Sequence, residues 1–468
     1  MLKWPIISSW IVIIIQQSTY QIITNSIDKK VLKHSRRLKS LDSLRGFAIF
    51  CMVLFHGFQL LEMDLLGVAS ALTENPVAKV IEFMARMAGI FVFISGISNS
   101  MSIYSRYSKG TTNGKKTIME SFIVGLWFII LERVVYRFLD RPVTGGGIYD
   151  FDTGPTYYSY ILGYLETGVF HPFPLYPTFF SSGALSMMGL SLMFYSVLLV
   201  ILFHNEGYKR IHRNLLIVGI LATFIIVISP FLIDILRPIW VQALIDENYG
   251  KIILVGILVG DSDPMMPFLG FALYGVAIGI EIKGKVPKNI FLLVGIIVSS
   301  IYIILGTIGY IIFGEPPVEH ILRTLPIQTT HLQIGIMILI VTMLVYSEIS
   351  KKDKRNTNKL DYKLKKKKER MTFLQLFGKF SLTMYLLESF FGSVIKLLIL
   401  DKVFPGWAQN MALVVCYSMI IVILWFFILK IWSKFGQIGS YDWMTAQIKK
   451  RVRKTLSEKE LKKNHSKF

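Results

Sequence analysis

Apolar runs long enough to cross a bilayer constrain this sequence more than any other feature. A transmembrane helix needs roughly 20 predominantly apolar residues. With 53% hydrophobic residues and a mean hydropathy of +0.54, the sequence predicts an all-α, polytopic membrane protein with a bundle of about ten transmembrane helices. We place these helices near residues 43–63, 83–104, 117–138, 183–204, 214–236, 265–282, 289–313, 331–349, 373–400 and 410–433.

Two weaker apolar segments do not fit this pattern. The segment 4–24 is interrupted by Gln16 and Gln17, and it is typical of an extra span, a signal-like segment or an interfacial helix. If it spans, the bundle has eleven helices. The run 251–260 is too short to cross and indicates a re-entrant or interfacial piece. We therefore divide the chain into an N-terminal hydrophobic segment, a transmembrane domain and a basic cytoplasmic tail, at 1–27, 28–435 and 436–468.

Charge in the connections predicts the orientation. The chain carries 51 Lys+Arg and a formal net charge of +21, which could indicate a nucleic-acid partner. Its distribution argues against that partner, because alternate connections hold roughly 37 of these residues and the opposite set about five, as the positive-inside rule requires. Both ends of the ten-helix bundle are therefore expected in the cytoplasm, with the protein in the plasma membrane.

One histidine lies deep inside the first run. Arg45 precedes His56 by eleven positions, so both side chains share a helix face about 16 Å apart along the axis. Because a hydrocarbon core is about 30 Å thick, His56 lies near its middle when Arg45 lies at the cytoplasmic surface. We predict that chemistry occurs at His56, in a channel that Arg45 and His56 line. A hydrogen bond between helices is the alternative role for such a histidine.

Four segments resemble those of one superfamily. They are SLDSLRGFAIFCMVLFHG at 40–57, FVFISGIS at 91–98, PMMPFLGFALYGVAIG at 264–279 and FGKFSLTMYLLESFFG at 377–392. Their motifs and order resemble the transmembrane acyltransferases: the acyltransferase-3 family and the heparan-alpha-glucosaminide N-acetyltransferase catalytic domain, with the YeiB-like proteins as relatives. In the last segment Glu388 stands where relatives often have His or Gln.

The resemblance implies acyl transfer from a cytoplasmic donor, acetyl-CoA or another acyl-CoA, to an acceptor on the far side. His56 is expected to be the general base or the nucleophile that carries the acyl group, with Asp42 orienting Arg45. No metal is expected. The donor's phosphates require cations at the inner mouth, and those placed for this are Arg36, Arg37, Lys39, Arg45, Lys109 and Lys115.

Other residues have supporting roles in this interpretation. Ser95 and Gly96 indicate either close approach of the backbone to an acyl chain or a small-residue helix contact. Tyr385 and Glu388 are expected to support His56, since a carboxylate in mid-membrane is costly without a function. His331 is expected towards the outer side, either near the acceptor or as an ordinary cap residue.

The sequence thus predicts a membrane-embedded acyltransferase that modifies a hydroxyl or amine of a glycan, a lipid-linked sugar or a similar small acceptor. The alternatives are a secondary transporter or exporter and a non-catalytic family member. The expected partners are the lipid bilayer and the acceptor, with no nucleic acid, and homodimer formation is left open.

Overall fold

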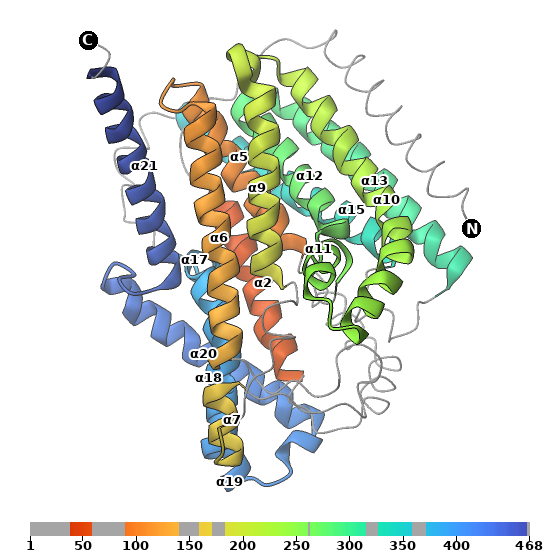
Figure 1. The fold of residues 1–468 in the computed structure, drawn as a ribbon, viewed down its shortest axis with the longest axis vertical. Coiled ribbons are helices and arrows are strands. Elements are labelled where there is room, and N and C mark those ends of the chain that lie inside the picture. Colours follow the sequence, from red (N-terminus) through yellow and green to blue (C-terminus); the bar gives the residue numbers. More distant parts are fainter. Residues whose placement is uncertain are drawn as a thin grey trace. The chain divides into compact units, whose positions relative to one another are not determined.

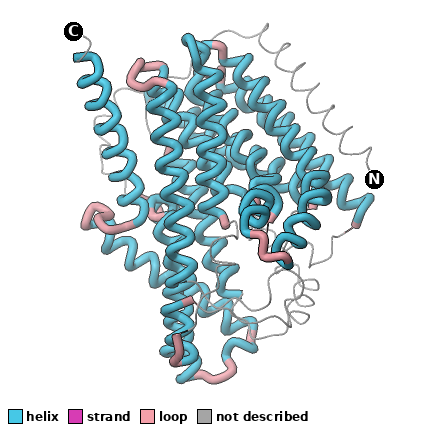
Figure 2. Tube along the Cα trace, viewed as in Figure 1, coloured by secondary structure: helices cyan, strands magenta, loops and turns pink. Residues whose placement is uncertain are grey.

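The computed structural model describes residues 38–58, 89–139, 159–170, 183–260, 263–314, 326–357 and 371–465. These parts contain helices and connecting loops and no strand (Figure 2). The segment 4–24 lies outside the described residues. The helices, of which the α elements are labelled in Figure 1, are α2 (Lys39–Phe58), α5 (Gly89–Tyr107), α6 (Gly114–Leu139), α7 (Tyr160–Thr167), α9 (Ala184–Phe203), η1 (His204–Lys209), α10 (Ile211–Ile245), α11 (Tyr249–Val259), α12 (Met265–Gly284), α13 (Lys288–Phe313), α15 (Ile327–Thr357), α17 (Phe373–Lys379), α18 (Ser381–Ile395), η2 (Lys396–Leu400), α19 (Asp401–Val403), η3 (Trp407–Gln409), α20 (Met411–Lys434) and α21 (Tyr441–His465).

The all-α, membrane-spanning fold is confirmed, and each of the ten predicted segments is helical in its described part. Among the described residues, seven helices are long and apolar enough to span: Ala184–Lys209, Ile211–Ile245, Met265–Gly284, Lys288–Phe313, Ile327–Lys351, Ser381–Val403 and Met411–Lys434. The predicted number of ten is therefore not confirmed: α2, α5 and α6 are not among these seven helices, and parts of the predicted spans 43–63 and 83–104 lie outside the described residues. With 11 residues, α11 is too short to span.

The chain forms two compact units, and the first comprises Met1–Leu41, Gly89–Gly125 and Ser182–Arg370. Its central helix is α12, which packs against α5, α9, α10, α11 and α15. The contact between α5 and α12 is unusually close because glycines lie in it: a Cβ at Gly96 would meet the Ala272 carbonyl, and one at Gly275 would meet that of Phe93. Backbones in direct contact gain dispersion energy and need no large side chains, as is common between membrane helices.

Hydroxyl groups join three helices of this unit. The Tyr274 hydroxyl lies 2.7 Å from Thr223 Oγ1 and 2.8 Å from the Tyr302 hydroxyl. The Tyr302 ring contacts that of His331, with 5.5 Å between centroids. His331 is buried and its Nδ1 donates to the Ile327 carbonyl. A buried polar chain of this kind stabilises the unit only because each hydroxyl has a partner.

The second unit comprises Asp42–Ala88, Leu126–Ser181 and Met371–Phe468. In it, α2 packs directly on α17: a Cβ at Gly46 would overlap the Leu374 carbonyl, and one at Gly378 would overlap the Asp42 carbonyl. The ring of Phe373 packs edge-on against that of Phe50, with 6.2 Å between centroids. This contact fixes the position of the histidine-bearing helix against the late helices.

The predicted span at 373–400 is two consecutive helices. A capping box begins α17, in which Thr372 Oγ1 accepts from the Gln375 N–H and the Gln375 side chain binds the Thr372 N–H. The helix is interrupted at Phe380, which has φ −109° and ψ 24°, and α18 begins at Ser381 with no cap from Phe380 itself.

We predict that Gly378→Ala destabilises the second unit by about 1–3 kcal/mol, because the added methyl group would overlap a backbone oxygen that cannot rotate away. Thermal unfolding of the purified protein in detergent measures the effect. Gly250→Ala is the matched control, since its nearest neighbour would be the Asn248 side chain at 3.7 Å. Equal unfolding temperatures for Gly378→Ala and the parent protein would contradict the close contact.

Candidate functional site

The most unusual polar contact in the second unit lies between two predicted spans. His56 Nδ1 forms a hydrogen bond or ion pair with Glu388 Oε1. The His56 side chain is 24% exposed and that of Glu388 only 3%. Burial of a carboxylate is costly unless it is paired, and here the imidazole is the partner. Sequence reasoning placed Glu388 near His56 without predicting this contact.

Helix register explains why these two residues meet. His56 and Glu388 are 332 positions apart, and the same separation relates Gly46 to Gly378, whose backbones are in close contact. From each glycine the chain advances ten residues, or about 15 Å, to its ionisable partner. Because both contacts join residues that are 332 positions apart, α2 and the α17–α18 segment must run parallel. The glycine contact therefore sets the height at which His56 meets Glu388.

A small cavity adjoins the pair. Its volume is about 20 Å³, which is enough for a single water molecule or hydroxyl group. Beside His56 and Glu388 it is lined by Val53, Ser389, Gly392, Ser393, Tyr417, Ser418 and Ile421. Arg45 does not line this cavity, so the expected channel shared by Arg45 and His56 is not seen there.

Two of the hydroxyl groups around the cavity donate to backbone carbonyls. The Tyr417 hydroxyl donates to the Gly392 carbonyl at 2.6 Å, and Ser418 Oγ donates to the Val414 carbonyl at 2.8 Å. The lone pairs of both hydroxyl oxygens can accept hydrogen bonds from a group bound in the cavity. The cavity is thus polar on one side and aliphatic at Val53 and Ile421.

The arrangement of His56 and Glu388 supports proton transfer at His56. A carboxylate on Nδ1 holds the imidazole in the tautomer that carries the proton on that nitrogen, which leaves Nε2 as a proton acceptor. The same logic operates in carboxylate–histidine dyads that activate hydroxyl nucleophiles. His56 can therefore take a proton from a group placed beside it, with Glu388 stabilising the resulting imidazolium.

The remaining predicted residues of this unit lie nearer the start of α2 or on α18. Asp42 and Arg45 are both partly buried in the first two turns of α2. The Arg45 guanidinium interacts electrostatically with the carboxylate of Asp442. Tyr385 lies one turn before Glu388 on α18 and is also partly buried.

Ser95, Gly96 and Lys39 belong to the first unit. Asn99 Nδ2 donates to Ser95 Oγ at 3.1 Å and to the Tyr195 hydroxyl at 3.1 Å, while Gly96 lies in the contact with α12. The Lys39 side chain is exposed at the start of α2, where the backbone N–H groups of Lys39 and Ser40 donate to the Glu348 carboxylate at 3.2 and 2.8 Å.

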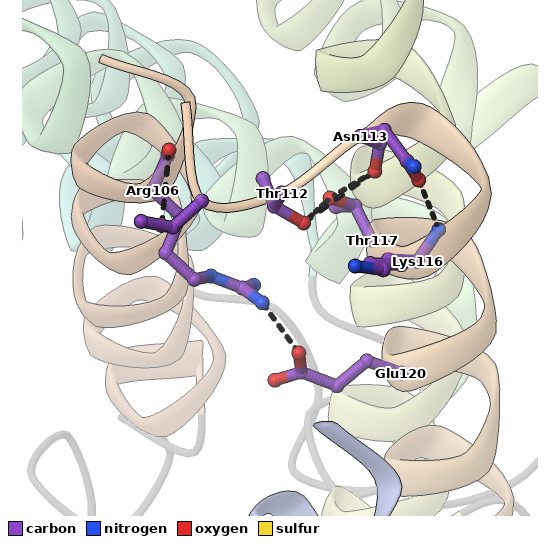
Figure 3. A network of polar contacts seen from close by, with 7 residues as sticks. Arg106, Thr112, Asn113, Lys116, Thr117 and Glu120 are labelled. Atoms are coloured by element: carbon purple, nitrogen blue, oxygen red, sulfur yellow. Dashed lines mark hydrogen bonds and ion pairs between the residues drawn. The ribbon is translucent and has the colours of Figure 1, made fainter. Parts of the chain in front are cut away.

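Lys109 and Lys115 are both exposed and flank the turn between α5 and α6. Arg106 anchors this turn through an ion pair with Glu120 at 2.5 Å (Figure 3). Asn113 Oδ1 accepts from the Lys116 N–H at 2.9 Å, and Thr117 Oγ1 donates to the Asn113 carbonyl at 2.9 Å. Lys109 thus lies in this hydrogen-bonded turn, and Lys115 lies in the first turn of α6. The other predicted cations, Arg36 and Arg37, lie outside the described residues.

Sequence reasoning missed the polar residues of the cavity on α18 and α20. Ser389, Ser393, Tyr417 and Ser418 are individually ordinary in membrane helices. The signal that could have found the pairing is the repeated ten-residue spacing from Gly46 to His56 and from Gly378 to Glu388. Such a match becomes meaningful only when the two helices are known to pack in parallel.

Comparison with known proteins identifies the family of this chain. No curated protein matches the chain. A family model described as an acyltransferase domain, that of the acyltransferase-3 family, matches residues 38–430. The matched part contains α2, α18 and the His56–Glu388 contact. The chain therefore belongs to the acyltransferase-3 family of membrane acyltransferases.

Proposed function

We propose that this protein transfers an acyl group, in the first instance acetyl, from a cytoplasmic acyl-CoA to a hydroxyl or amine of a glycan or lipid-linked acceptor. The observation that carries the proposal is the His56–Glu388 contact beside a cavity the size of one hydroxyl group. A buried carboxylate–imidazole pair with an adjacent polar space is the arrangement that general-base catalysis of acyl transfer needs.

In the proposed reaction His56 is the general base. The acceptor O–H or N–H gives its proton to His56 Nε2 as the oxygen or nitrogen attacks the thioester carbonyl. The tetrahedral intermediate collapses by breaking the carbon–sulfur bond, and the CoA thiolate leaves with the proton that His56 returns. Glu388 remains ionised throughout and stabilises the imidazolium, as the carboxylate does in related dyads. A nucleophilic role of His56 is the runner-up mechanism.

Donor binding is assigned to cations at the cytoplasmic side. Lys39, Lys109, Lys115 and Arg45 are the described candidates for the phosphates of the acyl-CoA. Lys109 and Lys115 support this assignment because both are exposed, one in the turn between α5 and α6 and the other in the first turn of α6. Asp42 is proposed to orient Arg45 from the preceding turn of α2.

The proposed topology has ten spans with both ends in the cytoplasm and the protein in the plasma membrane. The parallel direction of α2 and α18 supports it, because parallel helices are separated by an even number of crossings. In the ten-span arrangement α2 is the first span and α17–α18 the ninth, so both would run outward. Loop charge supports the same direction.

We predict that His56→Gln and Glu388→Gln each reduce acyl transfer by about 10²–10⁴-fold, although the glutamine amide can still form a hydrogen bond with the remaining partner. The measurement is incorporation of label from radioactive acetyl-CoA into endogenous glycans and lipids, in membranes from cells that express each variant. His204→Gln is the matched control, since His204 is exposed on η1. Parental activity in His56→Gln would exclude the proposed mechanism.

We also predict that Lys109→Gln and Lys115→Gln each raise KM for acetyl-CoA about 2–5-fold and leave kcat unchanged, because exposed ion pairs contribute only modestly. KM should also rise with ionic strength, since salt screens these contacts. Lys251→Gln, an exposed lysine on α11, is the control. Unchanged KM in both loop variants would remove these lysines from the donor site.

A further inference from the structure

The C-terminal helix lies beyond the part of the chain that the family model matches, which ends at residue 430. This helix, α21, nevertheless begins in a set of contacts with the second unit. Ser440 is fully buried, and its Oγ caps the helix by accepting from the Trp443 N–H at 3.1 Å. One turn later, Thr445 Oγ1 accepts from Trp127 Nε1 at 3.1 Å. The first turn of α21 is thus a docked part of the unit rather than a free tail.

Asp442 makes the most specific of these contacts. Its Oδ1 accepts from the Leu382 N–H at 3.3 Å, and its Oδ2 accepts from the Thr383 N–H at 3.0 Å and from Thr383 Oγ1 at 2.8 Å. The Tyr441 N–H donates in turn to Thr383 Oγ1 at 3.0 Å. A single carboxylate therefore binds three donors at the beginning of α18.

These donors need a partner from outside their own helix. The first N–H groups of a helix have no intrahelical acceptor, and a side chain at the preceding residue usually supplies one. The residue before α18 is Phe380, whose side chain cannot accept a hydrogen bond, and no side-chain cap is formed there. Asp442 supplies the missing cap and places a negative charge at the positive end of the helix dipole.

The same carboxylate interacts with α2. Burial raises the pKa of Asp442 above its ordinary value of 3.8, and its hydrogen bonds with Thr383 and Leu382 and the Arg45 guanidinium offset part of this rise. Arg45 and His56 lie on one helix, and Thr383 and Glu388 on the other. Asp442 thus interacts with α2 and α18 near the start of both helices. The His56–Glu388 contact joins the same two helices further along their axes.

We propose that Asp442 is a positioning residue: by binding the N-terminus of α18 and the Arg45 guanidinium, the appended helix α21 aligns Glu388 with His56 and fixes Arg45 for the donor. The proposal rests on the function proposed above. Thr383 precedes Glu388 by five residues, or about 7.5 Å along the helix, so a shift of this end is transmitted to the carboxylate on His56. The proposed steps of acyl transfer stay as described above, and α21 contacts none of the reacting atoms.

The pKa direction shows how the ionisation of Asp442 affects stability. A carboxyl group with a raised pKa in the folded protein favours folding most when protonated, below the unfolded value of about 3.8, and this contribution is lost as pH rises through the raised value. At neutral pH the charge on Asp442 is thus not a source of stability. Thermal unfolding of Asp442→Asn beside the parent protein shows whether a loss of activity comes from a loss of the fold.

The test compares five variants of the full-length protein in detergent and in membranes. We expect Asp442→Asn to reduce acyl transfer at low acetyl-CoA on the order of tenfold, the equivalent of one charge-assisted hydrogen bond. Asp442→Glu should recover part of this loss. Adding Arg45→Gln to Asp442→Asn should lower the rate by less than the product of the two single losses, because both substitutions remove the contact between Arg45 and Asp442, while only Asp442→Asn also removes the cap of α18. Thr445→Val removes the hydrogen bonds of Thr445 with Trp127 and with the Tyr441 carbonyl but leaves the contacts of Asp442 in place; it should retain parental activity and is the matched control.

A second readout does not depend on activity. Hydrogen–deuterium exchange of peptides covering 380–390 should be faster in Asp442→Ala than in the parent protein, because the capped N–H groups of Leu382 and Thr383 lose their acceptor. Unchanged exchange would overturn the proposal, as would equal losses of activity in Thr445→Val and Asp442→Asn. If His56→Gln is fully active while exchange rises in Asp442→Ala, the proposed function fails and the positioning of α18 by Asp442 stands.

Discussion

The parallel packing of α2 against the α17–α18 segment is the constraint on which the candidate site depends. Two glycines, Gly46 and Gly378, bring the helix backbones into contact. Because both helices then rise at the same rate, His56 and Glu388 meet at one height. A larger residue at either glycine would separate the helices, and the carboxylate would lose the partner that makes its burial tolerable. Close packing and paired charge are therefore coupled in this unit.

This coupling explains how the site is preorganised for reaction. A carboxylate with 3% exposure has little water to solvate it, so its interaction with the imidazole is stronger than it would be at a surface. The neighbouring cavity holds no more than one small group. An acceptor hydroxyl placed there would meet a base whose orientation is already fixed, so that little reorganisation is needed during reaction.

Much of the fold could be predicted from local pattern. Apolar runs located every described span, and the short run at 251–260 is the 11-residue helix α11. That Arg45 and His56 lie on one face of the helix also follows from helix periodicity alone. The contact between His56 and Glu388, 332 residues apart, could not be derived in that way. It depends on which helices pack together and in which register, and apolar runs are too alike to specify either. The cap that Asp442 supplies to α18 is a tertiary contact of the same kind.

A double-mutant cycle on His56 and Glu388 tests the central claim most directly, that the two residues act as one catalytic unit. Rates of acyl transfer from labelled acetyl-CoA would be measured for the parent protein, His56→Gln, Glu388→Gln and the double variant. If Glu388 acts only through His56, the double variant has the rate of His56→Gln alone. Losses that multiply in the double variant would contradict the account, because they would mean that the two residues contribute independently.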